Sequence, residues 1–378
     1  MGTTRKTRAP AKRSARKRDT LEELRARIDE LDAKVLGHLG ERYRVVEAIL
    51  KAKQRDGTPV YQPDRERSQL ARLERLNRQA GTPVQPAAVE AIFREILSAS
   101  RALQGAVAVA YLGPPGTYSE RAAREQFGSS AELLPVGSIP EVFRTVERTR
   151  AAFGVVPIEN STEGMVGQTL DAFVQSPLRI VAERQLQIRH ALLARSAGLA
   201  GIRLIVSHPQ SLAQCREWLA TNAPGIPTRE VASNAAAAEA ASRSRTTAAI
   251  AGEEAGRLYG LKVLADGIQD VPHNVTRFLV VAAESAVPPG ASDKISVLFS
   301  VKNEPGMLYR SLKPLAANGI DLFKIESRPL RGRIWDYLFF ADFAGEMTDP
   351  RVKRAMNAMK RHCVWFKVLG SYPAARVP

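Results

Sequence analysis

Hydroxyl and amide side chains gather in this chain where apolar stretches give way to helical patterns. Four such clusters lie in the middle of the sequence, at residues 117–119, 160–162, 207–210 and 233–234, and a fifth at 274–277 opens an apolar run. The first turn of a helix presents free N–H groups that hold anions, and open α/β sheets bind ligands at strand ends. Any one cluster is an ordinary helix cap. The five together predict a shared cleft for a carboxylate substrate.

A second group of polar residues lies on helical patterns nearer the N-terminus. Arg42 and Lys53 are eleven residues apart, close to three helical turns, so they share a face. Arg25 lies seventeen residues before Arg42, roughly 26 Å away at ~1.5 Å per residue and on another face. One small ligand therefore meets all three only if Arg25 comes from a second, antiparallel chain. Ser100 and Gln104 share a face by their spacing of four. Solvated helix faces carry the same residue types, so spacing alone leaves both interpretations open.

Three kinds of element must position these residues. Residues 19–105 begin with a capping box at Thr20 and Glu23 and show helical periodicity broken near 57–59 and 80–86, which predicts three helices in an intertwined dimer. In residues 106–285, short apolar strands alternate with helical stretches, which is α/β order. After a linker rich in Pro, Gly and Ser, residues 293–375 run strand, helix, strand, strand, helix, strand, the ferredoxin-like order.

Composition restricts the class of protein. The chain has 378 residues, 44% of them apolar, and only two cysteines, so it can bury several cores and needs no disulfide scaffold. The five histidines have no metal-type spacing, and His190 and His208 are expected to be structural polar residues near the cleft. No apolar run reaches the ~18 residues of a membrane helix. We therefore expect a cytoplasmic protein without metal, cofactor or membrane contact.

The net charge of +16 is uneven, because residues 1–18 carry eight basic and no acidic residues. Their low apolar content predicts a solvated, disordered tail rather than a nucleic-acid-binding arm.

The helical segment resembles the all-helical chorismate mutase family. The stretches LRARIDELDAKVLGHLGERYRVVEAILKAK, DRER and ILSASRALQ carry the resemblance. It implies substrate binding by Arg25 of the partner chain with Arg42, Arg65, Glu66 and Ser100, and catalysis by Lys53 and Gln104. Chorismate rearrangement is pericyclic, so it needs arginines that hold a dicarboxylate in a chair-like conformation and donors at the breaking ether oxygen. Gln62 stands where Asp is common in the family.

The middle segment resembles prephenate dehydratase, on the stretches YLGPPGTYSE, GVVPIENSTEG, SHPQSLAQC and NVTRF. The resemblance implies two αβ lobes around a cleft, as in a periplasmic binding protein. It makes Thr276 the catalytic residue, which holds or protonates the departing hydroxide while CO₂ leaves. The implied substrate-binding residues are Thr117, Ser119, Asn160, Ser161, Thr162, Ser207, Gln210, Gln214 and Arg277. Asn234 stands where Thr is common.

The last segment resembles the ACT regulatory domain, on EPGMLYRSL and KIESRP. The resemblance implies a phenylalanine site that is completed where two chains meet. Its residues would be Pro305, Gly306, Met307, Leu308, Glu326, Ser327, Arg328 and Pro329. Met307 stands where Ala is common.

These resemblances imply a multidomain, bifunctional chorismate mutase–prephenate dehydratase. It would have an all-α mutase domain (19–105), an α/β two-lobed dehydratase domain (106–285) and an α+β ferredoxin-like ACT domain (293–375). Chorismate and prephenate would be its substrates and phenylalanine its inhibitor, in a homodimer or homotetramer. Two alternatives stay open: a dehydratase whose helical domain only dimerises, and a non-catalytic amino acid sensor. Arogenate is an alternative to prephenate.

Overall fold

The computed structural model describes residues 19–56, 61–103, 105, 107–286, 292–329 and 337–375. The basic tail and Gln104 lie outside these residues. The chain divides into two compact units, residues 1–52 and 53–378. The residues of the second and third predicted helices belong to the second of these units.

The N-terminal helix α1 (Leu21–Asp56) begins where the capping box predicts. The Thr20 N–H donates to the Glu23 carboxylate (2.7 Å), and the Glu23 N–H donates to the Thr20 hydroxyl (3.2 Å). Leu24, Ile28 and Leu31 recur on one face and are 47, 56 and 48% exposed. A helix with an apolar stripe of this kind is typically stabilised by packing rather than by propensity.

Two shorter helices follow, α2 (Pro63–Ala80) and α3 (Pro86–Ala102). Tyr61, just before α2, is 2% exposed and lies in the same apolar cluster as Phe127 and Phe153. Its ring centroid is 5.1 Å from that of Phe127 and 5.0 Å from that of Phe153. A residue of the expected helical domain thus completes the core of the segment that follows.

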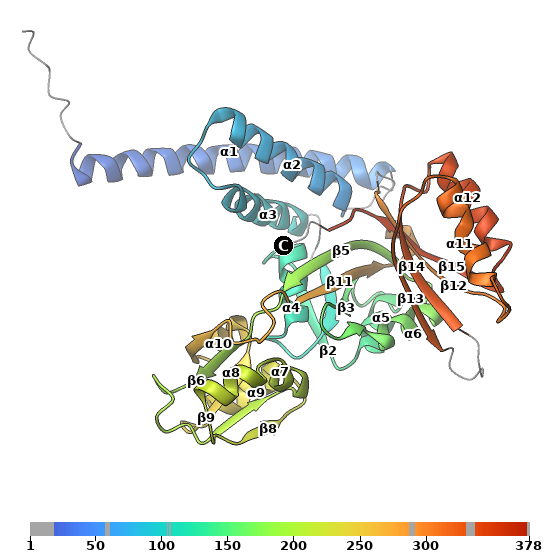
Figure 1. The fold of residues 1–378 in the computed structure, drawn as a ribbon. Coiled ribbons are helices and arrows are strands. Elements are labelled where there is room, and N and C mark those ends of the chain that lie inside the picture. Colours follow the sequence, from blue (N-terminus) through green and yellow to red (C-terminus); the bar gives the residue numbers. More distant parts are fainter. Residues whose placement is uncertain are drawn as a thin grey trace, which may run out of the picture. The chain divides into compact units, whose positions relative to one another are not determined.

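Residues 108–286 form the two predicted lobes (Figure 1). The first lobe has the sheet β2-β1-β3-β11-β5, with β4 paired to β3, and the second has the sheet β10-β6-β9-β7-β8. The chain passes between the lobes after β5 and after β10, and β11 returns to lie antiparallel between β3 and β5. The first lobe contains β1 (Ala108–Leu112), α4 (Tyr118–Phe127), β2 (Glu132–Val136), α5 (Ile139–Glu147), β3 (Phe153–Asn160), β4 (Gly164–Met165), α6 (Gly167–Gln175), β5 (Arg179–Gln187) and β11 (Val275–Ala282), followed by the short 3₁₀ turn η1 (Glu284–Ala286). The second contains β6 (Ala191–Ala194), β7 (Leu204–Ser207), α7 (Pro209–Gln214), α8 (Arg216–Asn222), β8 (Thr228–Glu230), α9 (Asn234–Ser242), β9 (Thr247–Ala251), α10 (Glu253–Leu258) and β10 (Lys262–Asp266).

The C-terminal segment has the expected βαββαβ order. Its elements are β12 (Lys294–Ser300), α11 (Met307–Ala317), β13 (Leu322–Pro329), β14 (Tyr337–Ala344), α12 (Pro350–Lys360) and β15 (Trp365–Tyr372). The sheet order is β13-β14-β12-β15, and α11 and α12 cover one of its faces (Figure 1).

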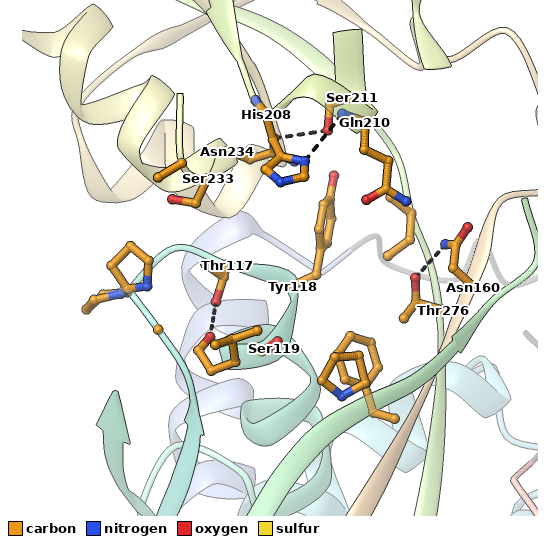
Figure 2. Close-up of a pocket in the computed structure, with 18 of the residues that line it drawn as sticks. Thr117, Tyr118, Ser119, Asn160, His208, Gln210, Ser211, Ser233, Asn234 and Thr276 are labelled. Atoms are coloured by element: carbon orange, nitrogen blue, oxygen red, sulfur yellow. Dashed lines mark hydrogen bonds between the residues drawn. The ribbon is translucent and has the colours of Figure 1, made fainter. Parts of the chain in front are cut away.

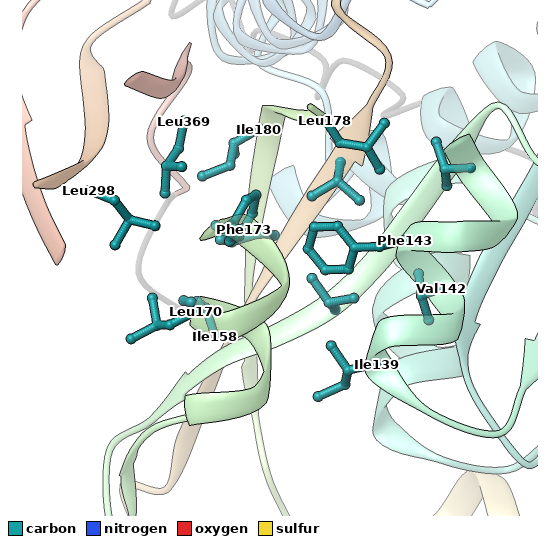
Figure 3. Packing of buried hydrophobic residues seen from close by; sticks show 14 of the residues in the cluster. Ile139, Val142, Phe143, Ile158, Leu170, Phe173, Leu178, Ile180, Leu298 and Leu369 are labelled. Atoms are coloured by element: carbon teal, nitrogen blue, oxygen red, sulfur yellow. The ribbon is translucent and has the colours of Figure 1, made fainter. Parts of the chain in front are cut away.

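The other face of this sheet packs on the first lobe and shares one apolar core with it. Leu298 and Leu369 of the C-terminal sheet lie beside Phe173 and Ile180 of the first lobe (Figure 3). At Gly370, an added Cβ would lie 2.2 Å from the Ile180 carbonyl oxygen, so only glycine allows the two backbones to approach this closely. Apolar packing therefore docks the two segments over a continuous interface.

Candidate functional site

A cavity of about 760 Å³ lies between the two lobes. Residues of all five polar clusters found in the sequence are among those that line it. Among them are Thr117, Ser119, Asn160, Gln210, Gln214 and Thr276, all of them predicted site residues. Asn160 and Thr276 lie on one side of the pocket and His208, Ser233 and Asn234 on another (Figure 2). The structure therefore brings side chains of both lobes to one cleft.

Asn160 and Thr276 are directly paired across β3 and β11, and their side chains are hydrogen bonded. Asn160 Nδ2 donates to Thr276 Oγ1 (2.8 Å) and to Asn274 Oδ1 (2.8 Å). Asn160 Oδ1 in turn accepts from the N–H groups of Thr162 (3.0 Å) and Glu163 (3.2 Å) and from the Thr162 hydroxyl (2.6 Å). The N–H groups of Thr162 and Glu163 can only donate, so they must face the Asn160 oxygen. The Asn160 nitrogen therefore faces Thr276. Thr276 Oγ1 accepts this hydrogen bond, and within the described part of the chain its hydroxyl donates to no other group, so its hydrogen is available to a molecule in the cleft.

The second lobe reaches this pair through Gln214, at the end of α7. Asn274 Nδ2 donates to Gln214 Oε1 (3.0 Å), and Gln214 Nε2 donates to Thr162 Oγ1 (3.0 Å). His190 Nε2 lies 2.9 Å from the same Gln214 oxygen. An oxygen only accepts, so His190 donates from Nε2, and its Nδ1 lies 3.2 Å from the Tyr118 hydroxyl, which itself donates to the Arg189 carbonyl (2.6 Å). Burial lowers the pKa of His190 and raises that of Tyr118, which favours the neutral form of both.

Three further predicted residues support the cleft without lining it. Ser161 accepts from the Val275 N–H (2.9 Å), and Thr162 holds Asn160 as described. Ser207 is fully buried and donates to the Ile250 carbonyl (2.6 Å), beside Asn234 Oδ1 (3.1 Å).

Arg277 is not brought to the cleft at all. Its side chain lies on the other face of β11, where it bonds to Glu183, Asp342 and Tyr372. Several polar lining residues were not among the predicted site residues, and His190 and Tyr118 are two of them. Tyr118 stands inside the cluster 117–119, whereas nothing local distinguishes His190 beyond its expected place as a structural residue near the cleft.

The predicted mutase residues lie in both units. Arg25 and Arg42 lie on α1 in the first unit, whereas Lys53, Arg65, Glu66 and Ser100 lie in the second. Burial lowers the pKa of Lys53, as does the charge of Arg65, while Glu66 opposes the shift. Burial raises the pKa of Glu66, against the opposing charge of Arg101 and of Lys53. Ser100 is buried, and its hydroxyl donates to the Ile96 carbonyl (2.6 Å).

Arg101 holds Glu66 in an ion pair of 2.5 Å. Its guanidinium also donates to the Phe127 carbonyl (2.5 Å), at the end of α4 in the first lobe. Arg101, which is 4% exposed, lies within the stretch ILSASRALQ but was not among the predicted site residues.

The two predicted phenylalanine motifs lie at the same end of the C-terminal sheet, where β12 and β13 finish. Leu338 of β14 pairs with Ser300 of β12 on one side and with Arg328 of β13 on the other. Pro305 to Leu308 follow β12, and Gly306 adopts φ 77° immediately before α11. Glu326 to Pro329 end β13. The Arg328 guanidinium donates to the Gly167 carbonyl and lies 3.0 Å from the Asp171 carboxylate, so this member of the motif contacts the first lobe.

Among the described residues, no group of three or more His, Cys, Asp or Glu side chains is arranged to hold a metal ion. None of the helices in the described ranges is long and apolar enough to cross a membrane.

Comparison with known proteins matches three family models in succession along the chain. They are chorismate mutase type II at residues 24–105, prephenate dehydratase at 109–286 and the ACT domain at 295–361. The bifunctional chorismate mutase/prephenate dehydratase of Aquifex aeolicus is 43% identical, over 94% of this chain and 99% of the relative. The structure of prephenate dehydratase from Arthrobacter aurescens in complex with L-Phe matches with a TM-score of 0.65 and 35% identity, over 71% of this chain and 90% of that one. GqqA, described as a quorum quenching acylase, matches with a TM-score of 0.64 and 30% identity, over 71% of this chain and 98% of that one.

A two-lobed cleft with a threonine–asparagine pair, joined to a ferredoxin-like domain and preceded by three helices, defines a multidomain enzyme with a prephenate dehydratase core. The match to the Aquifex relative extends through the helical region to nearly the whole length of both chains. The chain belongs to the bifunctional chorismate mutase/prephenate dehydratase family.

Proposed function

We propose that this chain converts chorismate to prephenate in its helical region and prephenate to phenylpyruvate in the cleft, under inhibition by phenylalanine. The observation that carries the proposal is the Thr276 hydroxyl, which accepts from Asn160 and keeps its hydrogen for the cleft. Membership of the bifunctional family supports both activities.

The test is to incubate the purified chain with chorismate and to measure prephenate and phenylpyruvate separately. We expect phenylpyruvate to form. If the chain converts supplied prephenate but does not consume chorismate, the helical region serves only as a dimerisation module. Phenylalanine binding without either conversion would indicate an amino acid sensor. The same assay with arogenate in place of prephenate decides which of the two is the better substrate.

The dehydration follows from the positions of the cleft side chains. Loss of CO₂ from the prephenate ring leaves an electron pair that expels the ring hydroxyl as the ring becomes aromatic. Thr276 donates its free hydrogen to the departing oxygen. The Asn160 amide then stabilises the negative charge that develops on Thr276 Oγ1, a donor placed in advance where charge appears. After CO₂ and water have formed, a proton from solvent restores the Thr276 hydroxyl. Ser119 and the first-turn N–H groups of the surrounding helices, which line the same cavity, bind the carboxylates.

For the mutase reaction, we infer a site shared by two chains. Arg25 of the partner, Arg42 and Arg65 would hold the two carboxylates of chorismate, and Lys53 and Gln104 would donate to the ether oxygen. The exposed apolar stripe of α1 supports a dimer, because such a stripe is normally covered by a second helix.

Subunit mixing tests this shared site. Mixing Arg25→Ala chains with Lys53→Ala chains should restore part of the mutase activity, since each mixed dimer keeps one intact site. If subunits are shown to exchange and no mutase activity returns, the site does not span the interface between two chains.

For regulation, phenylalanine would bind at the end of the C-terminal sheet that carries both motifs. The left-handed φ of Gly306 strains any other residue there, and an added Cβ meets nothing within 4 Å. Gly306→Val should therefore relieve inhibition, because it strains the loop backbone and places a side chain in open space where the ligand would approach. The matched comparison is Ser327→Ala, whose backbone is an ordinary strand. A chain cut at Ala286 should lose inhibition entirely.

We place the protein in the cytoplasm, as a homodimer or a homotetramer. Membership of a family of biosynthetic enzymes supports this placement. Sedimentation with and without phenylalanine distinguishes the two assemblies.

A further inference from the structure

Two neighbouring cross-strand pairs on β3 and β11 face opposite sides of the first-lobe sheet. Thr276 pairs with Asn160, and the next residue of β11, Arg277, pairs with Glu159. Side chains alternate along a strand, so the first pair faces the cleft and the second faces the C-terminal domain. Each residue of the cleft pair is thus covalently next to a charged residue that points at the C-terminal domain.

Arg277 is held by side chains of both domains. Its Nε donates to Glu183 of β5 (2.7 Å), one terminal nitrogen donates to Asp342 of β14 (2.5 Å), and the other donates to the Tyr372 hydroxyl of β15 (3.0 Å). Arg277 is 7% exposed, and Asp342 and Tyr372 are each 1% exposed. Ser296 of β12 also bonds to Asp342. A guanidinium removed from water needs all of these partners, so its position depends on the C-terminal domain.

Glu159 is held from the C-terminal domain as well. Its carboxylate pairs with the Lys324 ammonium on β13 and lies 3.9 Å from Arg277. Arg328, four residues beyond Lys324 on the same face of β13, contacts Asp171 and the Gly167 carbonyl. The strand that ends in a predicted phenylalanine motif is therefore tied to the first lobe at two points, and one of them adjoins Asn160.

We propose that Glu159 and Arg277 are positioning residues for the dehydration, through which the C-terminal domain controls the pair Asn160 and Thr276. The proposal rests on the function proposed above. A movement of β13 or β14 that weakens the contacts of Lys324 or Asp342 shifts the two catalytic strands, and with them the 2.8 Å hydrogen bond between Asn160 and Thr276. An amino acid that binds β13 differently in the two arrangements changes their populations by its differential affinity.

The apolar core between the domains makes this proposal testable. Leu298, Leu369 and their neighbours form an apolar core between the domains that includes none of these charged residues. Removing one charge should therefore alter control while the domains stay together.

The first experiment compares Lys324→Met with Lys367→Met. Lys367 is a matched control because it also joins the two domains, donating to the Phe173 (2.7 Å) and Ser176 (2.5 Å) carbonyls, but it adjoins neither catalytic strand. Dehydratase rate is measured against phenylalanine concentration, and phenylalanine binding is measured by calorimetry. Coupling between sites is typically about 5- to 150-fold. We expect Lys324→Met, whose contact with Glu159 is already lost, to bind phenylalanine and to have a lower kcat that phenylalanine reduces little further. Lys367→Met should be inhibited like the wild type. Inhibition of Lys324→Met to the wild-type extent would overturn control through Glu159.

The second experiment needs no phenylalanine. Asp342→Asn keeps the shape of the side chain and removes the charge beside Arg277. We expect kcat for dehydration to fall at least tenfold with KM within about twofold, while mutase activity stays at the wild-type level. An unchanged kcat would show that the Arg277 contacts serve stability alone, which would overturn the proposal. If the wild-type protein forms no phenylpyruvate, the proposed function itself is wrong. If the wild-type protein is active but phenylalanine does not inhibit it, the kcat of Asp342→Asn decides the proposal.

Discussion

Thr276 and Arg277 are consecutive residues of β11 with opposite surroundings. The Thr276 hydroxyl lies in the cleft between the lobes, and the Arg277 guanidinium lies buried on the other face, between Glu183 and Asp342. The resemblance to prephenate dehydratase placed both in one substrate site. Side chains alternate along a strand, so the two residues point to opposite faces of β11. Thr276 faces the cleft, and Arg277 contacts the C-terminal domain.

Thr276→Ala should nearly abolish dehydratase turnover, because it removes the hydrogen that reaches the leaving hydroxyl. Thr276→Ser keeps the hydroxyl and should retain part of the rate. The measurement is phenylpyruvate formation from supplied prephenate, with chorismate consumption as the control for folding. Equal loss in both variants would instead point to packing of the threonine methyl group.

Asn160→Asp replaces a donor by an acceptor of nearly the same shape. The carboxylate introduced by this substitution would compete for the Thr276 hydrogen and place a negative charge where one must develop. We expect kcat for dehydration to fall on the order of 10²-fold or more, the usual effect of losing a transition-state donor. Steady-state kinetics with prephenate check this. Wild-type kcat in the variant would mean that the amide does not orient the threonine.

The sequence predicted the elements far better than the contacts between them. The α/β and βαββαβ orders and the five polar clusters depend on local patterns, and the structure has both orders and brings residues of all five clusters to the cleft. Arg277 and Arg328 were assigned to ligand sites by resemblance to known families, and their contacts in the structure are made with Asp342 and Asp171, more than 60 and 150 residues away. His190 was missed as a partner of Gln214, since no local pattern records which loop lies opposite.

The ion pair of Glu66 with Arg101 predicts a pH effect on the mutase. Burial raises the pKa of Glu66, and the Arg101 charge opposes that rise. If ionised Glu66 accepts from the chorismate hydroxyl, activity falls as pH falls through its pKa. Arg101→Met removes the opposing charge, so the pKa rises further and the acidic limb of the mutase kcat/KM profile should move to higher pH.

The control for this variant is Arg94→Met, which removes another partly buried arginine of α3 that pairs with Glu90 rather than Glu66. Its mutase profile should keep the wild-type acidic limb. If the wild type, Arg101→Met and Arg94→Met all had the same acidic limb, Glu66 would not be the group that causes the pH dependence.

Tyr61 predicts that the helical region and the dehydratase cannot be separated at residue 105 without loss of stability. Its ring fills the core beside Phe127 and Phe153, Gln126 donates to its hydroxyl (2.5 Å), and Arg101 lies 5.7 Å from the ring centroid. Tyr61→Ala should cost about 3 kcal/mol or more, the scale of emptying an aromatic site in a core. Tyr61→Phe keeps the ring and should cost only about 1 kcal/mol for the lost hydrogen bond.

Loss of dehydratase activity on heating reports the effect on the relevant domain, since a chain of several domains does not unfold in one step. A chain that begins at residue 106 lacks Tyr61 and should inactivate at a temperature at least as low as Tyr61→Ala. Inactivation of that shortened chain at the wild-type temperature would show that the dehydratase core closes without Tyr61.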